Sequence, residues 1–540
     1  MSSYHNFLLI NNIKLSVNAS QAEAFSVAKG ILKKASLASY AKEYSIYRRS
    51  VDARKKPDIY FVYTVAVKGD FPKAKNDMLQ KYGISYQEEM PKPKIEIGDI
   101  PMDGPPIIVG SGPAGIFAAL LLAESGYNPV ILERGGSISE RRDAVDKFNK
   151  EHILDPNTNI QFGAGGAGTF SDGKLVTRIN DPLTNYILER FVDFGAPEEI
   201  RYIAKPHIGT DILSVVVDNM LCHIESLGGK IMYHTTFTSA NADGSGMIHS
   251  ISTSSGEMKC GALILAIGHS ARDTYENLFN LNFAIEPKPF SVGMRIEHLA
   301  DDIDFALYGS SALNPNLGRA EYALSCNTKE RGSYTFCMCP GGVVVAAASE
   351  EGGVCVNGMS YHARDGKNSN SAILTSVRCD DYGNTPMGAI NFQRKIERGA
   401  FIAGGGEYCA PIITVKDFLN GDLKTEPNRI IPTYMSASNV KLARPDEYLP
   451  EFVCNGLKDA ITSFDKKIKG FAVGDAVLTG AETRTSAPVR ILRDSETRLA
   501  IGYKNIFPAG EGAGYAGGIT SAAVDGAKSA LALIKIFKPH

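Results

Sequence analysis

The 540-residue sequence has no tryptophan, which excludes nothing, and no apolar run long enough to cross a membrane. Its longest apolar runs, Gly115 to Ala123 and Gly342 to Ala348, are well short of the ~18 residues that a membrane helix needs. The first residues, MSSYHNFLLINNIKL, show no basic segment ahead of their short apolar run and no small-residue cleavage site. We therefore expect a cytoplasmic protein without membrane contact.

The sequence also lacks the paired patterns of metal and disulfide sites. It contains no CxxC pair and no HExxH segment, so no metal site is predicted. Its nine cysteines are an odd number scattered from Cys222 to Cys454, which is typical of reduced thiols in a large intracellular enzyme. A disulfide framework is therefore not expected.

Net charge is small, because 57 Lys and Arg stand against 59 Asp and Glu. The balance hides an asymmetry: residues 1 to 95 contain 16 basic and 8 acidic side chains, a charge of +8 that leaves −10 for the rest. A basic module docked on an acidic body would explain it. The alternative is contact with RNA or another polyanion, for which the module offers a close group of five cations: Arg48, Arg49, Arg54, Lys55 and Lys56.

Residues 1 to 95 are predicted to form a small α+β module of the ferredoxin-like type. Two segments with strand character, Phe7 to Val17 and Ile59 to Val67, alternate with two of helical spacing, Ala22 to Leu37 and Phe71 to Lys81. The prolines that follow favour an extended connector: Pro91, Pro93, Pro101, Pro105 and Pro106. The length and the ordinary globular composition leave room for two to four domains.

The most informative stretch is PPIIVGSGPAGIFAALLLAESGYNPVILER, residues 105 to 134. Ile107 to Val109 have the pattern of a buried strand, and a GxGxxG turn leads into an apolar helix, Ile116 to Glu124. In this pattern Gly110 makes the tight turn, Gly112 allows the ligand to approach closely, and Gly115 allows the helix to pack closely. The segment predicts a dinucleotide site in a Rossmann-type α/β domain.

The helix of this segment supplies the electrostatics of binding. Its free N-terminal N–H groups and positive dipole end offer a site for a pyrophosphate without any cationic side chain. Val130 to Leu132 are expected to form the next strand, and Glu133 follows Gly115 by 18 residues, close to the ~20 expected for a carboxylate that binds ribose. An ordinary exposed acid is the alternative for Glu133. The neighbouring positions complete the predicted contacts: Pro113, Ala114 and Arg134.

After this unit the chain makes a long excursion and then returns to the same sheet. Thr210 is predicted to cap a helix from Asp211 to Leu227, and strands are expected at Lys230 to Thr238 and at Met247 to Ser254. The run ALILAIG, Ala262 to Gly268, is predicted as a buried parallel strand whose glycine end meets the ligand crevice, with simple core as the alternative.

The domain boundaries follow from these segments. Residues 96 to 285 are assigned to the first part of the nucleotide-binding domain, and residues 486 to 540 close it. Residues 286 to 485 are richer in β-type segments and carry no nucleotide fingerprint, so we assign them as an inserted, β-rich substrate or cap domain.

The closing segment, GYKNIFPAGEGAGYAGGITSAAVDGAKSALALI, supplies a second glycine-rich helix start. It has a short strand at Ile506 to Ala509, a flexible turn, and a helix from about Thr520. A second helix N-terminus in the same crevice would stabilise negative charge on the pyrimidine edge of a reduced flavin, a group that NAD lacks. The predicted contacts of this segment are Gly510, Glu511, Gly512, Gly518 and Ile519.

A second literal GxGxxG occurs in IQFGAGGAGTFSDGK, residues 160 to 174, and is not interpreted as a second nucleotide fingerprint. No apolar helix follows it, and no acidic residue closes a second βαβ unit. We expect a loop that runs along the flavin ring and pyrophosphate, with an ordinary flexible loop as the alternative. Its predicted contacts are Gly165, Gly166, Gly168, Thr169, Ser171, Asp172 and Lys174. A separate NAD(P)H domain is not predicted, so any nicotinamide would bind transiently.

The first and last glycine-rich segments together resemble the FAD domain of glutathione-reductase-type flavoproteins. Over nearly its full length the chain is also similar to a group of bacterial FAD-dependent, or NAD(FAD)-utilising, dehydrogenases of undefined substrate. The resemblance rests on IQFGAGGAGTFSDGKL, PHIGTD, AIGHSARDTY, SYTFCMCPGGVVV, VNGMS, ETRTSAPVRILRD and PAGEGAGYAGGI. It implies FAD as cofactor and a redox reaction. It also implies a hydrogen bond between Glu511 and the ribityl chain, at a position where related chains more often carry Asp.

Five residues are weighed as catalytic candidates. Cys337 and Cys339 stand two apart on an expected strand, so both thiols would face one side; small buried residues are the alternative. His269 follows Gly268 and would lie near the cofactor as a donor or base. Arg295 and Arg484 could hold a substrate carboxylate, with ion pairs at the surface or between domains as the alternative.

The sequence thus predicts an FAD-dependent oxidoreductase that transfers a hydride through flavin N5 to or from a small organic substrate. Two other functions stay open. The basic module suggests a flavin-dependent RNA-modifying enzyme, and the lack of a decisive acid–base pair suggests a flavin-binding sensor or scaffold without catalysis.

Overall fold

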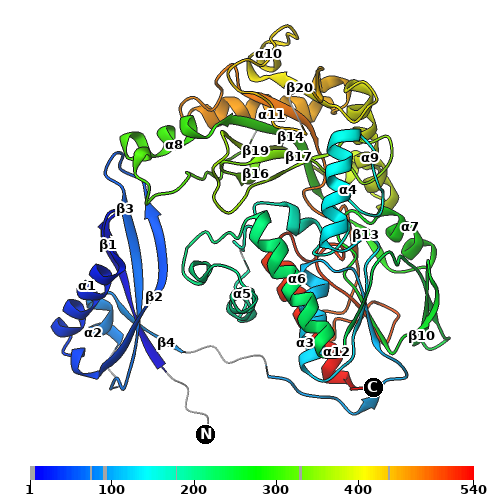
Figure 1. The fold of residues 1–540 in the computed structure, drawn as a ribbon, viewed down its shortest axis with the longest axis horizontal. Helices are drawn as coiled ribbons and strands as arrows, with labels where there is room; N and C mark the ends of the chain where they lie inside the picture. Colours follow the sequence, from blue (N-terminus) through cyan, green and yellow to red (C-terminus); the bar gives the residue numbers. More distant parts are fainter. Residues whose placement is uncertain (1–5, 73–75, 89–93, 178, 328–330, 436–437) are drawn as a thin grey trace.

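The computed structural model describes residues 6–72, 76–88, 94–177, 179–327, 331–435 and 438–540. Figure 1 shows an N-terminal sheet (blue) at the left, a parallel sheet with its helices at the lower right, and a larger sheet at the top. Two of the five connector prolines, Pro91 and Pro93, lie outside the described residues. Among the described residues, no helix combines the length and the apolar character that a membrane span requires.

The N-terminal module has the connection order β-α-β-β-α-β. Its elements are β1 (Asn6–Ser16), α1 (Gln21–Lys34), β2 (Ala41–Asp52), β3 (Tyr60–Gly69), α2 (Asn76–Lys81) and β4 (Ile84–Glu88). The strands pair antiparallel in the order β2-β3-β1-β4, which is the ferredoxin-like arrangement. Helix α1 begins with a capping box between Ser20 and Glu23 and buries Ala24, Ala28 and Leu32, spaced four residues apart.

Two strands of this module, β2 and β4, are missing from the sequence prediction. Strand β2 is an edge strand whose side chains are mostly exposed or half-buried, so it shows no regular apolar alternation. The helix expected from Phe71 to Lys81 is only the six residues of α2. Sequence periodicity finds elements by the face they bury, and β2 has no fully buried side chain.

The module docks on the rest of the chain through β2. The Arg49 N–H donates to the Tyr202 carbonyl oxygen at 2.7 Å, and the Arg49 guanidinium lies 5.7 Å from the centre of the Tyr202 ring. The Lys56 ammonium donates to the Ala306 carbonyl oxygen, and Arg54 pairs with a neighbouring aspartate of the module. Three members of the predicted cation group are therefore engaged within the chain.

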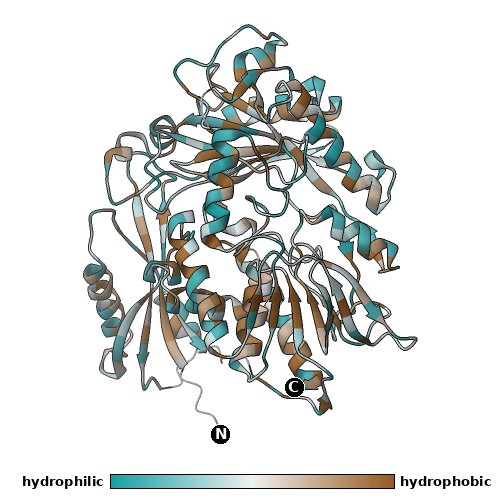
Figure 2. Cartoon of the chain, turned by 45° about the vertical axis from the view of Figure 1, so that its right-hand side comes forward, coloured by the Kyte–Doolittle hydropathy of each residue, from teal (hydrophilic) through white to brown (hydrophobic). Residues whose placement is uncertain are grey.

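The nucleotide-binding domain is built on a five-stranded parallel sheet in the order β24-β12-β6-β7-β8. Its strands are β6 (Pro106–Val109), β7 (Val130–Leu132), β8 (Lys230–Met232), β12 (Ala262–Leu265) and β24 (Ile506–Pro508). Figure 2 shows these strands as strongly apolar, as expected for a sheet buried on both faces. In chain order the sheet reads 3-2-1-4-5, so its winding reverses between β6 and β12, where such sheets bind ligands.

Three local predictions in this domain are wrong. Thr210 is not the N-cap of α6 (Thr210–Ser226): Gly209, with φ of +84°, holds that place, and the Thr210 hydroxyl donates to the Thr169 carbonyl oxygen at 2.5 Å. The strand expected at Lys230 to Thr238 is two strands, β8 and β9 (Phe237–Ala242). The connector prolines are not wholly irregular, since Pro101 ends β5 (Ile100–Pro101), which pairs with β25 (Phe537–Lys538).

The cap domain is a seven-stranded sheet in the order β15-β16-β19-β14-β22-β20-β21. Its strands are β14 (Phe290–Leu299), β15 (Ser325–Asn327), β16 (Gly332–Cys339), β19 (Asn368–Val377), β20 (Ala410–Thr414), β21 (Val440–Leu442) and β22 (Val477–Glu482). The two crossings between the domains lie side by side, because β13 (Ile285–Pro287) pairs antiparallel with β23 (Val489–Ile491). The cap is thus an insertion into the nucleotide-binding domain.

The remaining elements cover these sheets or connect them. The helices are α3 (Pro113–Glu124), α4 (Ile138–Glu151), α5 (Leu183–Asp193), α7 (Arg272–Asn280), α8 (Ala300–Tyr308), α9 (Pro386–Ala403), α10 (Val415–Asn420), α11 (Glu451–Asp465) and α12 (Ile519–Ile536). The remaining strands are β10 (Ile248–Thr253) and β11 (Gly256–Lys259), which form a meander with β9, and the hairpin of β17 (Val343–Ala346) and β18 (Val356–Met359).

Candidate cofactor site and active-site cavity

A cavity of about 310 Å³ lies between the parallel sheet and the cap domain. The N-termini of α3 and α12 both open on it: Gly112 and Gly518 hold the N-cap positions, and neither helix has a side-chain cap within the described residues. The helices cross closely, since a Cβ at Gly526 would lie 1.9 Å from the Ala114 carbonyl oxygen. Two positive dipole ends therefore face one space, which suits an anionic group such as a pyrophosphate.

The glycines around the cavity fall into two groups. A Cβ added at Gly268, Gly517 or Gly518 would meet no described atom within 4 Å, so the backbone there faces open space. A Cβ at Gly115 would instead lie 1.9 Å from the Gly110 carbonyl oxygen, where the helix packs on its own strand. The first group gives a ligand direct access to the backbone, and on this geometry the residues fit a bound dinucleotide.

Most of the predicted cofactor contacts line this cavity. They are Gly110, Gly112, Pro113, Ala114, Glu133, Arg134, Gly166, Gly168, Ser171, Asp172, Lys174, Gly268, Glu511, Gly518 and Ile519. Five others stand behind its wall: Gly115, Gly165, Thr169, Gly510 and Gly512. Two of these glycines allow neighbouring segments to approach closely. A Cβ at Gly510 would lie 2.6 Å from the Ala114 Cβ, and a Cβ at Gly512 would lie 2.6 Å from backbone atoms of Gly268.

The loop with the second GxGxxG forms one wall of the cavity. The Gly165 N–H donates to the Ser111 carbonyl oxygen at 3.0 Å, and a Cβ at Gly166 would lie 2.9 Å from the Cα of Gly112. A short 3-10 helix, Ala167–Phe170, follows in place of an α-helix. Thr169, expected as a polar contact, is buried in this turn beside α6, so its prediction is wrong.

The Glu133 carboxylate accepts hydrogen bonds from three loops. Its Oε2 accepts hydrogen bonds from the Ser111 N–H at 3.0 Å and from the Ser111 hydroxyl at 2.6 Å, and its Oε1 accepts from the N–H groups of Gly135 and Gly163. The side chain is buried yet lines the cavity. It is therefore not an ordinary exposed acid, and contact with a ribose would add to bonds that it already makes.

Asp172 and Lys174 belong to a buried ion cluster. The Lys174 ammonium lies 2.6 Å from Asp172 Oδ2 and 3.5 Å from Glu321 Oε1, and Arg364 pairs with both carboxylates. Burial would raise the pKa of Asp172, but Lys174 and Arg364 outweigh it and hold that pKa below its usual value. Lys174 thus presents a compensated positive charge to the cavity.

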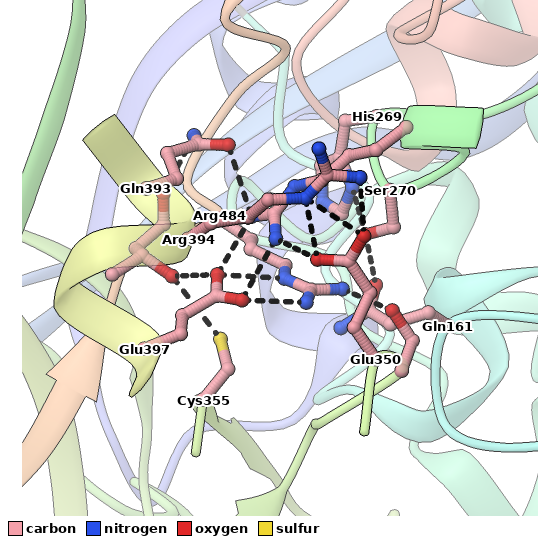
Figure 3. Close-up of polar contacts among 12 residues, drawn as sticks. Gln161, His269, Ser270, Glu350, Cys355, Gln393, Arg394, Glu397 and Arg484 are labelled. Atoms are coloured by element: carbon pink, nitrogen blue, oxygen red, sulfur yellow. Dashed lines mark hydrogen bonds and ion pairs between the residues drawn. The ribbon is translucent and has the colours of Figure 1, made fainter. Parts of the chain in front are cut away.

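A second buried network joins the nucleotide-binding and cap domains (Figure 3). Glu397 of α9 binds two guanidinium groups: Arg272 of α7 at 2.7 and 2.8 Å, and Arg484 at 2.8 and 3.0 Å. Burial would raise the pKa of Glu397, but the two arginines hold it well below its usual range. Glu397 and Ser349 of the same domain therefore occupy the Arg484 guanidinium, which argues against its binding of a substrate carboxylate, while the Arg272–Glu397 pair joins the two domains.

His269 lines the cavity beside this network. Its Nδ1 lies 2.8 Å from the Ser270 hydroxyl, which in turn donates to Gln161 Oε1 at 3.1 Å (Figure 3). Burial, followed by the charges of Arg484 and Arg272, lowers the pKa of His269 to about 3. The imidazole is neutral at physiological pH and is suited to hydrogen bonding, while a role as general base is disfavoured.

The cap wall of the cavity carries Cys337. A bulge in β16 inserts one residue between Phe336 and Cys339, and Cys337 there has φ of +43°. This bulge breaks the alternation on which the prediction of a shared face relied: Cys337 lines the cavity, whereas Cys339 is buried behind it. A hydrogen bond from the Cys339 thiol, helped by Arg295 and Lys174 and opposed by burial, lowers the pKa of Cys337 to about 6.

Arg295 stands behind this wall and does not line the cavity. Its guanidinium donates to Asn370 Oδ1 at 2.9 Å, to Asn357 Oδ1 at 3.2 Å and to the Cys337 carbonyl oxygen, and it lies 3.4 Å from Glu482 Oε2. These protein partners occupy the guanidinium N–H groups that were expected to bind a substrate carboxylate, as the partners of Arg484 do.

Two carboxyl groups of the cavity titrate far from their usual range. Burial raises the pKa of Glu482 to about 7, with Arg295 opposing the shift. Burial likewise raises the pKa of Glu511 to about 7, opposed by Lys288 and assisted by Cys337. Both groups therefore exchange protons near neutral pH, as proton carriers in active sites must.

Sequence reasoning missed part of the cavity lining on both domains. The unpredicted residues with polar or aromatic side chains include Gln161, Phe162, Ser270 and Thr274 of the nucleotide-binding domain and Phe336, Asn357, Glu482 and Thr485 of the cap. Several lie inside the stretches that carried the family resemblance, such as VNGMS and ETRTSAPVRILRD. Those stretches were the available signal, but they assigned no chemistry to single residues.

Comparison with known proteins places the chain in a family. Residues 289–485 match a family described as FAD-dependent protein, C-terminal domain-like, and residues 8–68 match a family described as a domain of unknown function. An uncharacterized protein of Clostridium beijerinckii (strain ATCC 51743 / NCIMB 8052) is 44% identical over 532 residues, which is 98% of each chain. This chain belongs to the same family as the clostridial protein. The FAD-dependent family match falls on the cap domain, which supplies Cys337 and Glu482.

Similarity to solved structures is much lower. L-amino acid deaminase from Proteus vulgaris aligns with a TM-score of 0.33 and 13% identity, covering 83% of this chain and 96% of that one. L-proline dehydrogenase from P. horikoshii aligns with a TM-score of 0.34 and 12% identity, covering 80% and 93%. At these scores the two alignments carry no argument about the reaction.

Proposed function

We propose that this protein is an FAD-dependent oxidoreductase that transfers a hydride to or from a small organic substrate held against the cap domain. The observation that supports it most is the meeting of two uncapped helix N-termini, those of α3 and α12, at one cavity. One N-terminus suits the pyrophosphate and the other suits the flavin end. The match of residues 289–485 to an FAD-dependent family supports the same cofactor.

Different residues of the chain would hold the cofactor, orient the reacting groups and transfer the substrate proton. Backbone at Gly112, Gly166 and Gly518 would hold FAD, and bound FAD would supply two-electron transfer at N5. The neutral His269 would orient a cofactor or substrate group by hydrogen bonding. Glu482, on the cap wall, would take or give the substrate proton, because its pKa of about 7 allows both states at neutral pH.

Rapid reduction of the bound flavin tests this function. Under anaerobic conditions, NADH or NADPH mixed with the purified protein in a stopped-flow instrument should bleach the flavin absorbance, and an electron acceptor should restore it. A binding protein without catalysis, the sensor or scaffold alternative, would show neither fast reduction nor turnover with any reductant. That outcome would remove the oxidoreductase proposal while leaving FAD binding intact.

The RNA-modifying alternative finds less support in the module. Arg49, Arg54 and Lys56 are engaged within the chain, which leaves fewer cations for a polyanion and favours a basic module docked on an acidic body. Salt-dependent RNA binding by the full chain at low ionic strength would reopen this alternative.

A further inference from the structure

The cap wall holds a pair of thiols that the proposed hydride transfer does not use. Cys337 reaches the cavity, and the Cys339 thiol lies behind it, donating to the Cys337 carbonyl oxygen at 3.4 Å. The two cysteines flank the bulge of β16, where Cys337 has a positive φ. Both residues are free cysteines.

The surroundings of the two thiols differ in a way that suits different roles. Cys337 faces the ligand space near the cations Arg295 and Lys174, which stabilise a thiolate, the nucleophilic form of cysteine. Cys339 is fully buried, and its hydrogen bond to Cys337 together with burial raises its pKa well above the usual value. A thiolate at the cavity wall backed by a buried thiol is the arrangement of an attacking and a resolving cysteine.

We propose that Cys337 and Cys339 form a redox-active dithiol that reduces a small disulfide bound in the cavity. This names a substrate class for the protein. Cys337, as thiolate, attacks one sulfur of the disulfide, so that a mixed disulfide forms and one substrate thiolate leaves. Cys339 then attacks Cys337 Sγ, its proton goes to the departing substrate sulfur, and the Cys337–Cys339 disulfide forms while the second substrate sulfur leaves as a thiol. The substrate gains two electrons and the cysteine pair loses them.

The order of the steps follows from the charges. The Cys337 thiolate is one cause of the raised pKa of Cys339. Once Cys337 is bound in a mixed disulfide, that negative charge is gone, so Cys339 loses its proton more readily when it has to attack. Return of the pair to the dithiol state takes two electrons and one proton, which reduced FAD would supply. Only this return step rests on the proposed function.

Mass spectrometry after thiol trapping tests the proposal. The intact protein is equilibrated with mixtures of reduced and oxidised glutathione. It is then denatured in the presence of N-ethylmaleimide, which labels the free thiols, and digested with trypsin. The peptide 332–364 carries Cys337, Cys339 and also Cys355, which is buried with its Sγ 3.4 Å from the Thr483 hydroxyl. As the oxidised fraction rises, Cys337 and Cys339 should lose their labels together, the peptide should be two hydrogen atoms lighter than its doubly unlabelled form, and Cys355 should keep its label.

Variants separate the two roles. Cys339→Ser should leave Cys337 trapped as a mixed disulfide with glutathione, because nothing resolves it, whereas Cys337→Ser should leave Cys339 reduced. Cys355→Ser is the matched control and should behave as the wild type. Labels retained on both cysteines of the wild type at every glutathione ratio would overturn the proposal, as would a mixed disulfide on Cys339 in Cys337→Ser. The wild-type measurement needs no variant to fold.

The same assay distinguishes failure of the dithiol from failure of the flavin function. It is run on protein with and without added FAD, and glutathione alone oxidises the pair in both. A dithiol that forms in protein without flavin would stand even if the proposed function failed. A reducible flavin with unreactive cysteines would give the opposite result.

Discussion

Several ionisable residues of the cavity have pKa values that are shifted by their surroundings. Glu482 and Glu511 have pKa values of about 7 because burial penalises their ionised forms. The pKa of Cys337 is shifted in the other direction, to about 6, because a thiol donor and two cations favour its thiolate. These groups exchange protons between pH 6 and pH 7, and the neutral His269 does not. None of the shifts follows from sequence, because each depends on neighbours brought from distant strands.

Glu482 makes stability depend on pH in a defined direction. Its pKa rises from 4.5 to about 7 on folding, so the folded protein binds the proton more tightly than the unfolded chain. The stabilisation is complete below pH 4.5 and is lost as the pH rises through about 7. Wild-type protein should therefore lose roughly 2–3 kcal/mol more stability between pH 5 and pH 8 than Glu482→Gln. Denaturant unfolding at the two pH values measures this difference.

An exposed glutamate provides the control. Glu189→Gln on α5 should leave the difference between the two pH values as in the wild type. Equal pH dependence in wild type and Glu482→Gln would show that Glu482 is ionised throughout, and its assignment as proton carrier would fail.

Elements hold the cavity together through a few buried interactions. Helix α7 from the nucleotide-binding domain, and α9 from the cap, meet at Glu397, which also anchors Arg484 just after β22. Periodicity predicted the fingerprint helix and the parallel strands, since these are continuous apolar runs. It missed β2, an exposed edge strand, and the bulge of β16, because neither leaves a regular apolar pattern.

Removal of the Glu397 charge should loosen this domain contact. Glu397→Gln leaves the Arg272 and Arg484 guanidinium groups buried without their shared carboxylate, and breaking such a pair costs about 3–5 kcal/mol. The matched variant Glu276→Gln removes a part-exposed partner of Arg394 and should cost less than about 1 kcal/mol. Unfolding free energies of the two variants check the prediction. Equal losses would mean that the buried network contributes no more than a surface ion pair.

At the scale of the whole molecule, the order of parts along the chain differs from their arrangement in space. The nucleotide-binding sheet is completed only by β24 (Ile506–Pro508), almost four hundred residues after β6, and the cap inserted between them supplies one wall of the cavity. Sequence could predict this return because both glycine-rich segments carry a local pattern. The cap wall could not be predicted, because Cys337, Asn357 and Glu482 meet only through the pairing of the seven-stranded sheet and its covering hairpin.

The central claim is that the two helix N-termini bind one FAD between them. Gly517, beside the start of α12, faces open space and has no positive φ, so a leucine there would fill the cavity without straining the backbone. Gly244 also faces open space but lies on a distant turn, and Gly244→Leu is the matched control.

The most direct test is the amount of FAD released per chain on denaturing the purified protein, identified by chromatography and mass. The account predicts one FAD per chain for the wild type and for Gly244→Leu, and binding at least about tenfold weaker, a loss of about 1.4 kcal/mol, for Gly517→Leu. A folded wild-type protein that contains no flavin and takes up none from excess FAD, or a Gly517→Leu variant that binds FAD as tightly as the wild type, would contradict it.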